Sequence, residues 1–360
     1  MFKCKPDYEE AQKMMDAFWD NEDAGRPFVH MTYPRPGAEP FPAKEYPSLE
    51  ARWLDVGYRT EAAAHYMENT VFVAEAMPVV MPNMGPEILS AWAGCPYVYG
   101  EGTTWTEPCV SDWETDGDKA VVDMKHPLFL KLEEFTRLLL ERGKDSFITG
   151  LTDFHPGGDH LAALRDPQAL AADLLERPEL VKAKLKSSYP EYFAAYDHFL
   201  DILLAAGMPI ASWLPLTAKK SMYIPSNDFS CMISAQMFEE FFLDGIAEEC
   251  RKYDRSVYHL DGPGAIRHLD ALLAIPELDA VQWVPGAGRE DIAQWIGLFR
   301  KVLSAGKSVI AYPKDVGELR LLMDALPARG LFLQMWGGVK DADEAMDLMR
   351  IIEKWPRNKL

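Results

Sequence analysis

The C-terminal half of the chain alternates short apolar runs with longer amphipathic segments. The apolar runs cover residues 256–260, 280–284, 308–312 and 331–336. Each is short and apolar throughout, which is typical of buried parallel strands. The amphipathic segments between and after them predict helices over residues 265–274, 290–305, 316–326 and 341–354. Regular alternation of strands and helices predicts βαβ units and a parallel sheet.

The same rhythm extends towards the N-terminus in weaker form. Further strands are predicted over residues 27–33, 77–81, 147–151, 210–214 and 221–228, and long helices over 166–186 and 234–253. A total of about eight or nine strands predicts an α/β fold, a single closed (β/α)8 TIM-type barrel. We therefore interpret residues 1–360 as one domain.

Two segments lie outside this repeat. Residues 1–20 predict an amphipathic helix, so the barrel has an N-terminal helical extension. Residues 95–125 are rich in Gly, Pro and acidic side chains and predict three short β segments, at 97–99, 103–106 and 120–123. We interpret them as a small β insertion packed over the barrel mouth.

Composition narrows the classes of partner. The net charge of −19 repels phosphate backbones and anionic lipids, so we expect neither nucleic acid nor membrane as a partner. The cysteine count is odd at five, and no Cys-x-x-Cys pair occurs. That pattern disfavours a disulfide scaffold or a cysteine zinc knuckle and fits the reducing cytoplasm.

The run Tyr-His-Leu-Asp-Gly-Pro-Gly, residues 258–264, carries the strongest chemical signal. Because a strand alternates its faces, His259 and Asp261 point the same way and Leu260 the other. The pair stands at the C-terminal end of a predicted strand, where parallel α/β proteins bind ligands. The residues predict either a metal or acid site on His259 and Asp261 or a buried histidine held by its neighbouring carboxylate.

Polar and aromatic side chains follow the other predicted strands. We take Asp153 and Asp228, with His259 and Asp261, as catalytic candidates, because converging carboxylates either raise one another's pKa or bind a divalent metal. Helix or turn capping is the alternative role for Asp153 and Asp228. The candidates for substrate binding are Tyr33, Arg35, Asn83, His155, Gln282, Trp283, Tyr312, Gln334 and Trp336.

Several segments resemble the superfamily of uroporphyrinogen decarboxylases and cobalamin-related methyltransferases. The resemblance is strongest over residues 226–242, 258–273 and 278–288, and it extends to 148–181 and 81–95. It implies a (β/α)8 barrel with its site at the C-terminal mouth. The methyltransferase branch carries His-x-Cys on the central strand and a cysteine on the last strand, which together hold zinc.

This chain departs from both branches. Asp261 stands where the first cysteine is expected, and the last strand offers Gln334 and Trp336 without a cysteine. A divalent metal such as zinc would therefore be held by the nitrogen and oxygen atoms of His259 and Asp261. The decarboxylase branch carries arginines in its first-strand loop for a tetracarboxylate, whereas the matching residues here, 29–37, include the single arginine Arg35.

The resemblance leads to a functional hypothesis. It implies a corrinoid-linked methyltransferase, the demethylase component for a small methylated O- or N-compound, with the corrinoid carried by a separate partner protein. A homodimer is among the expectations. Two alternatives remain: a uroporphyrinogen decarboxylase-like lyase acting on a small carboxylic acid, and a non-catalytic ligand-binding barrel.

Overall fold

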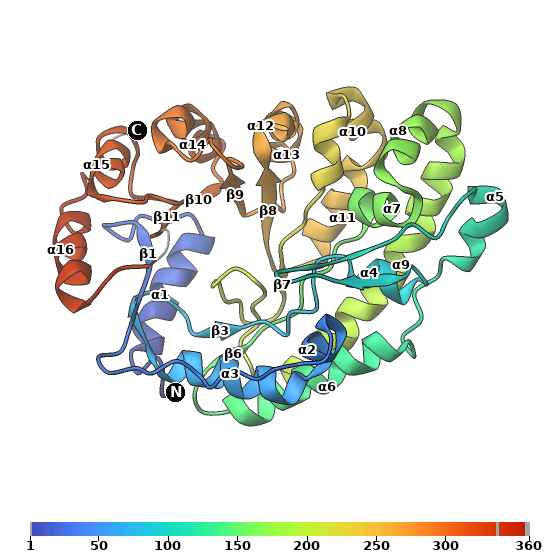
Figure 1. Cartoon of the computed structure of the whole chain (residues 1–360). Helices are drawn as coiled ribbons and strands as arrows, with labels where there is room; N and C mark the ends of the chain where they lie inside the picture. Colours follow the sequence, from blue (N-terminus) through green and yellow to red (C-terminus); the bar gives the residue numbers. More distant parts are fainter. Residues whose placement is uncertain (1, 336–337, 357–360) are drawn as a thin grey trace.

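The fold was analysed in a computed structural model that describes residues 2–335 and 338–356. It is a mixed α/β structure, with its strands at the centre and its helices outside them (Figure 1). The strands are β1 (Phe28–Pro34), β2 (Thr70–Ala74), β3 (Val79–Val80), β4 (Tyr97–Tyr99), β5 (Thr104–Thr106), β6 (Ile148–Thr149), β7 (Met222–Tyr223), β8 (Arg255–Asp261), β9 (Ala280–Val284), β10 (Ser308–Ala311) and β11 (Leu331–Gln334).

The helices form the outer layer. They are α1 (Tyr8–Trp19), α2 (Leu49–Leu54), α3 (Val56–Glu68), α4 (Ile88–Trp92), α5 (Trp113–Asp116), α6 (Pro127–Gly143), α7 (Gly157–Arg165), α8 (Pro167–Glu176), α9 (Pro178–Ala205), α10 (Ala235–Phe241), α11 (Leu243–Lys252), α12 (Gly262–Ala265), α13 (Leu269–Leu273), α14 (Ile296–Ser304), α15 (Val316–Ala325) and α16 (Ala342–Ile352). Short 3-10 turns occur at η1 (Gly117–Lys119), η2 (Asp228–Met232), η3 (Ile266–His268) and η4 (Ile292–Trp295).

The main sheet contains seven strands in the order β2-β1-β11-β10-β9-β8-β7. All neighbouring pairs are parallel except β1 and β2. A second parallel pair joins β3 to β6. The carboxyl ends of β8, β9, β10 and β11 therefore lie at one edge, and strand register decides which side chains meet there.

Strand alternation divides the core into two parts. Val257, Ala280, Ile310 and Phe332 belong to one cluster, which fills the space on the inner side of the strands. Their sequence neighbours point the other way, into a second cluster that packs against the outer helices; these are Tyr258, Val281, Val309, Leu331 and Leu333. These strands are apolar along most of their length because both of their faces are buried.

Beyond the paired strands, single backbone hydrogen bonds connect neighbouring segments. Leu151 N donates to Ala211 O at 2.7 Å, and Glu75 N donates to Val29 O at 3.1 Å. The parallel α/β class, the N-terminal helix and the β4–β5 hairpin of the insertion are confirmed. Closure of the sheet into an eight-stranded barrel stays a prediction.

Several predicted elements differ in detail, and the strand expected over 210–214 is reduced to an isolated bridge between Ile210 and Ala218. The helix expected over 234–253 divides into α10 and α11 at Phe242, and that over 166–186 divides where Pro178 begins α9. A proline lacks the amide N–H that would continue the preceding helix. Residues 120–123 form no strand; instead the Ala120 carbonyl accepts a hydrogen bond from the buried Lys184 ammonium at 2.6 Å. Among the described residues, no helix has the length and apolar character needed to cross a bilayer.

Candidate functional site

Three polar side chains meet at the end of β8. His259 and Asp261 lie on the inner face of this strand, and Asp228 begins η2 after β7. One ligand atom from each of the three lies within 4.8 Å of the other two. His259 Nε2 is 3.9 Å from Asp228 Oδ1, which is too long for a hydrogen bond. We call Asp228, His259 and Asp261 the strand-end triad.

His259 is held from the side opposite to the carboxylates. Its Nδ1 lies 2.7 Å from Gln282 Oε1, and Gln282 Nε2 donates to the Tyr312 hydroxyl at 2.6 Å. The Gln282 oxygen accepts a hydrogen bond from the Nδ1–H group, so Nε2 carries the lone pair that faces the triad. The indole of Trp213 packs edge-to-face on the imidazole, with ring centroids 5.1 Å apart. The ring is therefore fixed in both tautomer and orientation.

The carboxyl of Asp261 is harder to ionise than that of a free aspartate. Burial raises its pKa, and the nearby Asp228 carboxylate raises it further, while His259 acts in the opposite direction. Gly262 follows with a φ of +74°, a left-handed conformation in which a side chain would be strained. This turn begins α12 directly after Asp261 and leaves the carboxyl at the rim of the strand.

The donor set of the triad fits a divalent metal. It offers one imidazole nitrogen and two carboxyl groups, a combination that binds zinc and other first-row metals. The hydrogen bond from His259 Nδ1 to Gln282 is the kind of outer contact that orients a metal-binding histidine. His259, Asp261 and Asp228 would hold such an ion, so the metal ligands predicted at His259 and Asp261 gain Asp228 as a third donor.

A second histidine and carboxylate lie close by, after β6. His155 Nε2 is 2.7 Å from Asp153 Oδ1. Burial alone would lower the pKa of His155, but the Asp153 carboxylate outweighs it and raises the pKa to about 9. This pair is therefore a closed ion pair at neutral pH.

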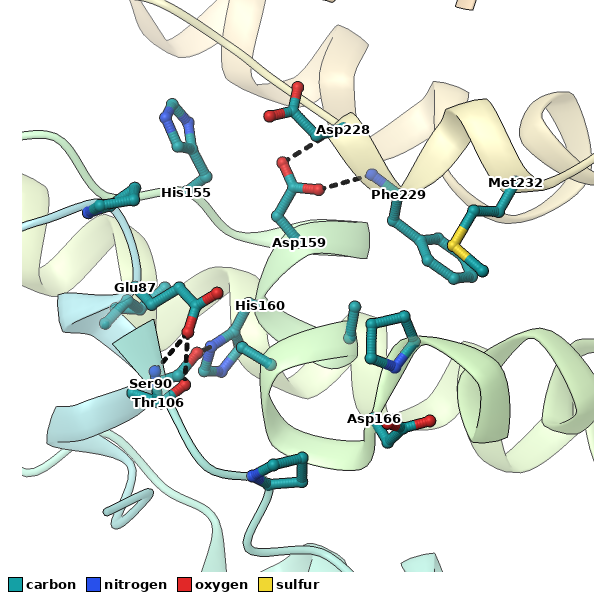
Figure 2. Close-up of a pocket in the computed structure, with 16 residues that line it drawn as sticks. Glu87, Ser90, Thr106, His155, Asp159, His160, Asp166, Asp228, Phe229 and Met232 are labelled. Carbon is teal, nitrogen blue, oxygen red and sulfur yellow. Dashed lines mark hydrogen bonds between the residues drawn. The ribbon is translucent and has the colours of Figure 1, made fainter. Parts of the chain in front are cut away.

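Asp159 connects the two histidine regions. Its carboxylate accepts hydrogen bonds from the amides of Asp228 at 3.0 Å and Phe229 at 2.9 Å, as Figure 2 shows. Burial raises the pKa of Asp159 to about 6, and the Asp228 carboxylate contributes to that rise. Asp159 thus holds the first turn of η2 and with it the position of Asp228.

A cavity of about 520 Å³ opens beside the triad. Asp228 belongs to both, and His155 and Asp159 line the cavity as well (Figure 2). Its walls come from α4, β5, α7 and η2, and they combine carboxylates with apolar groups; the lining residues are Pro86, Glu87, Leu89, Ser90, Thr106, Pro108, His155, Asp159, His160, Ala162, Ala163, Asp166, Pro167, Asp228, Phe229 and Met232. The volume is typical of a small-molecule site.

Most of the predicted site residues lie around the triad. Gln282 and Tyr312 contact it through His259, and Gln334 lies on the inner face of β11, where its half-buried side chain carries a buried oxygen without a hydrogen-bond partner in the described structure. Asp153 lies next to His155. Trp336 lies outside the described residues.

Three predicted residues lie elsewhere, and a fourth, Asn83, is bonded within its own turn. Trp283 pairs with Leu260 in register and therefore points to the helix layer, where its ring packs at a tilt against Trp295 with the ring centroids 4.8 Å apart. Tyr33 lines a separate cavity, and Arg35 is exposed, with its guanidinium donating to Glu68 O at 2.8 Å. Asn83 accepts a hydrogen bond from Gly85 N at 2.7 Å, so it shapes its own turn.

The sequence pattern did not identify His30 on β1 as a site residue, because β1 and β11 differ in length. β1 is longer than β11, and its last residues pair with β2 instead. The residue opposite Gln334 is His30, three positions before Tyr33. Its buried Nδ1 has no hydrogen-bond partner within the described chain, and burial lowers the pKa of His30 to about 4. Only the register of the sheet identifies it.

Asp159 was missed because it lies inside a helix. It occupies the first turn of α7, in the sequence His-Pro-Gly-Gly-Asp-His, and not a strand end. The two glycines are a usable signal, because Gly158 packs so closely on Asn227 that an added Cβ would lie 2.3 Å from the amide oxygen. Such an approach places the start of α7 against the start of η2.

Comparisons with solved structures bear on the fold. The chain is similar to a methyltransferase from Methanosarcina mazei, with a TM-score of 0.61 and 11% sequence identity over 96% of this chain and 98% of that one. An HpcH/HpaI aldolase from Desulfitobacterium hafniense DCB-2 aligns over 46% of this chain and 80% of its own, at 12% identity and a TM-score of 0.25, too low to support an argument. No protein-family model matches the sequence. No curated protein matches it either. At 11% identity the first similarity shows a shared fold.

Proposed function

We propose that this protein is a methyltransferase of the corrinoid-linked type, acting on a small methylated O- or N-compound. The observation that carries the proposal is the strand-end triad, in which an oriented imidazole and two carboxylates face one another beside a cavity. The fold shared with a methyltransferase over nearly the whole of both chains supports it. A corrinoid on a separate partner protein would accept the methyl group.

The residues of the triad would act on the atom that loses the methyl group. An alkoxide or phenolate is a poor leaving group unless it is protonated or held by a metal. The pKa of Asp261 is raised by burial and by Asp228, which favours its protonated, proton-donating form. Alternatively, with both carboxyl groups ionised, His259 Nε2, Asp228 and Asp261 would hold a divalent metal such as zinc at the same point.

The adjoining cavity would bind the rest of the substrate. Leu89, Phe229 and Met232 supply apolar surface on its walls. Among the described lining residues there is no Lys or Arg, and the one cation at neutral pH is the His155 imidazolium. A neutral or cationic methylated compound suits this lining better than a polyanion.

Metal content tests the site directly. We expect one zinc ion per chain in purified wild-type protein by elemental analysis, and its loss in His259→Ala. His198→Ala is the matched control, because His198 also contacts a carboxylate, Glu133, at 2.9 Å but lies on α9. Zinc that persists in His259→Ala, or that is missing from the wild type after zinc supplementation, would contradict the metal site.

Methyl transfer tests the activity. We expect the purified protein to methylate reduced corrinoid in the presence of some methoxylated or methylamine compound, followed by the change in corrinoid absorbance. Asp261→Asn should lower turnover while the circular dichroism spectrum stays unchanged. Release of carbon dioxide from a small acid, without any methyl transfer, would favour the lyase alternative. Binding without either reaction would favour a non-catalytic barrel.

A further inference from the structure

Two cysteine thiols meet at the base of the β4–β5 hairpin. Cys95 precedes β4 and Cys109 follows β5, and their sulfur atoms are 3.1 Å apart. The antiparallel pairing of the hairpin brings them together: Tyr97 pairs with Thr106, and Glu107 N donates to Pro96 O at 2.9 Å. One position outward, Cys95 lies opposite Pro108, and Cys109 is the next residue along the chain. A disulfide bond of about 2.05 Å needs a further approach of only about 1 Å.

The pair packs against α7, the helix that forms one wall of the cavity. The amides of Cys109 and Val110 both donate to Leu164 O, at 3.0 and 2.9 Å. Cys95 Sγ lies 3.7 Å from Ala163 O. Thr106 and Ala163 also line the cavity, so the thiol pair lies directly behind its wall.

The two thiols differ in access. Cys95 is buried, whereas Cys109 is partly exposed. The Cys95 thiol donates to Cys109 and, by that hydrogen bond, lowers the pKa of Cys109 to about 7. Cys109 is therefore the group that an oxidant meets first, and Cys95 is the thiol placed to resolve the product.

Cys231 provides the contrast within the same chain. It is exposed, but burial of its sulfur and the carboxylates of Asp228 and Asp261 raise its pKa. A thiol with a raised pKa contains less thiolate at neutral pH, so Cys231 should react more slowly despite its exposure. In the described structure Cys4 and Cys250 are both buried.

We propose that Cys95 and Cys109 form a reversible intramolecular disulfide when the protein meets a small-molecule disulfide oxidant such as glutathione disulfide. The Cys109 thiolate attacks one sulfur of the oxidant, which forms a mixed disulfide and releases one glutathione thiolate. The Cys95 thiol then gives up its proton and attacks the Cys109 sulfur, which releases the second glutathione. The two cysteines are oxidised by two electrons and the glutathione disulfide is reduced to two thiols.

This bond would fasten the hairpin at its base. The closed loop would run from residue 95 to residue 109 and contain both strands of the hairpin, including the cavity residue Thr106. Cross-linking restricts the unfolded chain, so the oxidised protein should melt at a higher temperature than the reduced one.

Non-reducing peptide mapping after treatment with glutathione disulfide tests the proposal on the intact chain. We expect a cross-linked peptide pair joining Cys95 to Cys109 in the wild type and equally in Cys231→Ser, which removes the exposed competitor. Dithiothreitol should reverse the link. A wild-type map in which both cysteines remain alkylatable, or in which either is joined to another cysteine, would overturn the proposal.

Two variants separate the roles of the sulfurs. Cys95→Ser should accumulate a glutathione adduct on Cys109, because the resolving thiol is missing. Cys109→Ser should leave Cys95 alkylatable only after denaturation. Both variants keep a small side chain at the position, and their circular dichroism checks the fold. Absence of the adduct from folded Cys95→Ser would show that Cys109 is not the attacking thiol and would also overturn the proposal.

Discussion

The regions around His259 and His155 use the same residue types in opposite ways. His155 Nε2 bonds Asp153 at 2.7 Å, whereas His259 Nε2 stands 3.9 Å from Asp228. The first pair is complete as an ion pair. In the second, Gln282 bonds Nδ1 of His259, and Nε2 remains directed at the carboxylates of Asp228 and Asp261.

His155 and Asp153 therefore form a structural ion pair, whereas His259 is positioned to bind a ligand. A closed ion pair contributes charge: the His155 imidazolium lowers the pKa of Asp159, although burial and Asp228 raise it more. An open histidine held from behind is pre-organised to bind an ion or a proton. The distance to the nearest carboxylate, and not the presence of one, distinguishes the two.

The largest expected effect concerns the closed pair. Asp153→Asn should lower the free energy of unfolding at pH 6 by roughly 3 kcal/mol, because His155 loses the partner that raises its pKa to about 9 from an unfolded value near 6.5. A raised histidine pKa stabilises the fold fully below about pH 6.5, and that stabilisation is lost as the pH rises through about 9.

The difference between wild type and Asp153→Asn should therefore shrink between about pH 6.5 and 9. Urea unfolding followed by circular dichroism at a series of pH values measures it. Zinc content should stay at the wild-type level, which serves as the control. An equal deficit at pH 6 and pH 9.5 would show that Asp153 acts by packing and not by pairing with a charged His155.

The next largest effect is expected at Gln282, which orients His259 in the strand-end triad. Gln282→Leu keeps the approximate volume but removes the acceptor of His259 Nδ1, so zinc affinity should fall by about 10- to 100-fold. Competition with a chelator measures the change. If zinc affinity is unaffected, His259 is not oriented by Gln282 and the contrast between the two histidines fails.

A smaller effect is expected at Tyr312, which contacts His259 only through Gln282. In Tyr312→Phe the amide of Gln282 loses its acceptor at 2.6 Å, which should cost about 1 kcal/mol, or roughly fivefold in zinc affinity. The same titration reports it. A loss of zinc affinity larger than that of Gln282→Leu would place Tyr312 itself among the ligands of the ion and would change the proposed set of metal ligands.

The smallest effect is expected at Arg35. Its side chain is exposed and donates to the Glu68 carbonyl at the end of α3, so Arg35→Ala should change the free energy of unfolding by less than about 0.5 kcal/mol. Turnover should be unchanged. A large fall in substrate affinity would return Arg35 to the site and would imply that the region after β1 moves towards the triad.

Sequence patterns predicted the elements well where a strand is buried on both faces. The strand over 280–284 has the predicted bounds, and those around it differ by a residue or two. Alternation along β8 placed His259 and Asp261 on the same face, and the register of β9 put Gln282 opposite His259. The same rule applied to β9 would have turned Trp283 away from that face, because it is the immediate neighbour of Gln282.

The sequence by itself determined the parallel α/β class, the acidic surface and the His-x-Asp pair, because all three depend on local pattern or composition. Tertiary structure alone decided that Asp228 completes the triad, that His30 lies opposite Gln334, and that Cys95 meets Cys109. Each of these contacts joins residues of different segments. Their meeting depends on strand register and helix placement, to which every contact in the core contributes and which no short window of sequence contains.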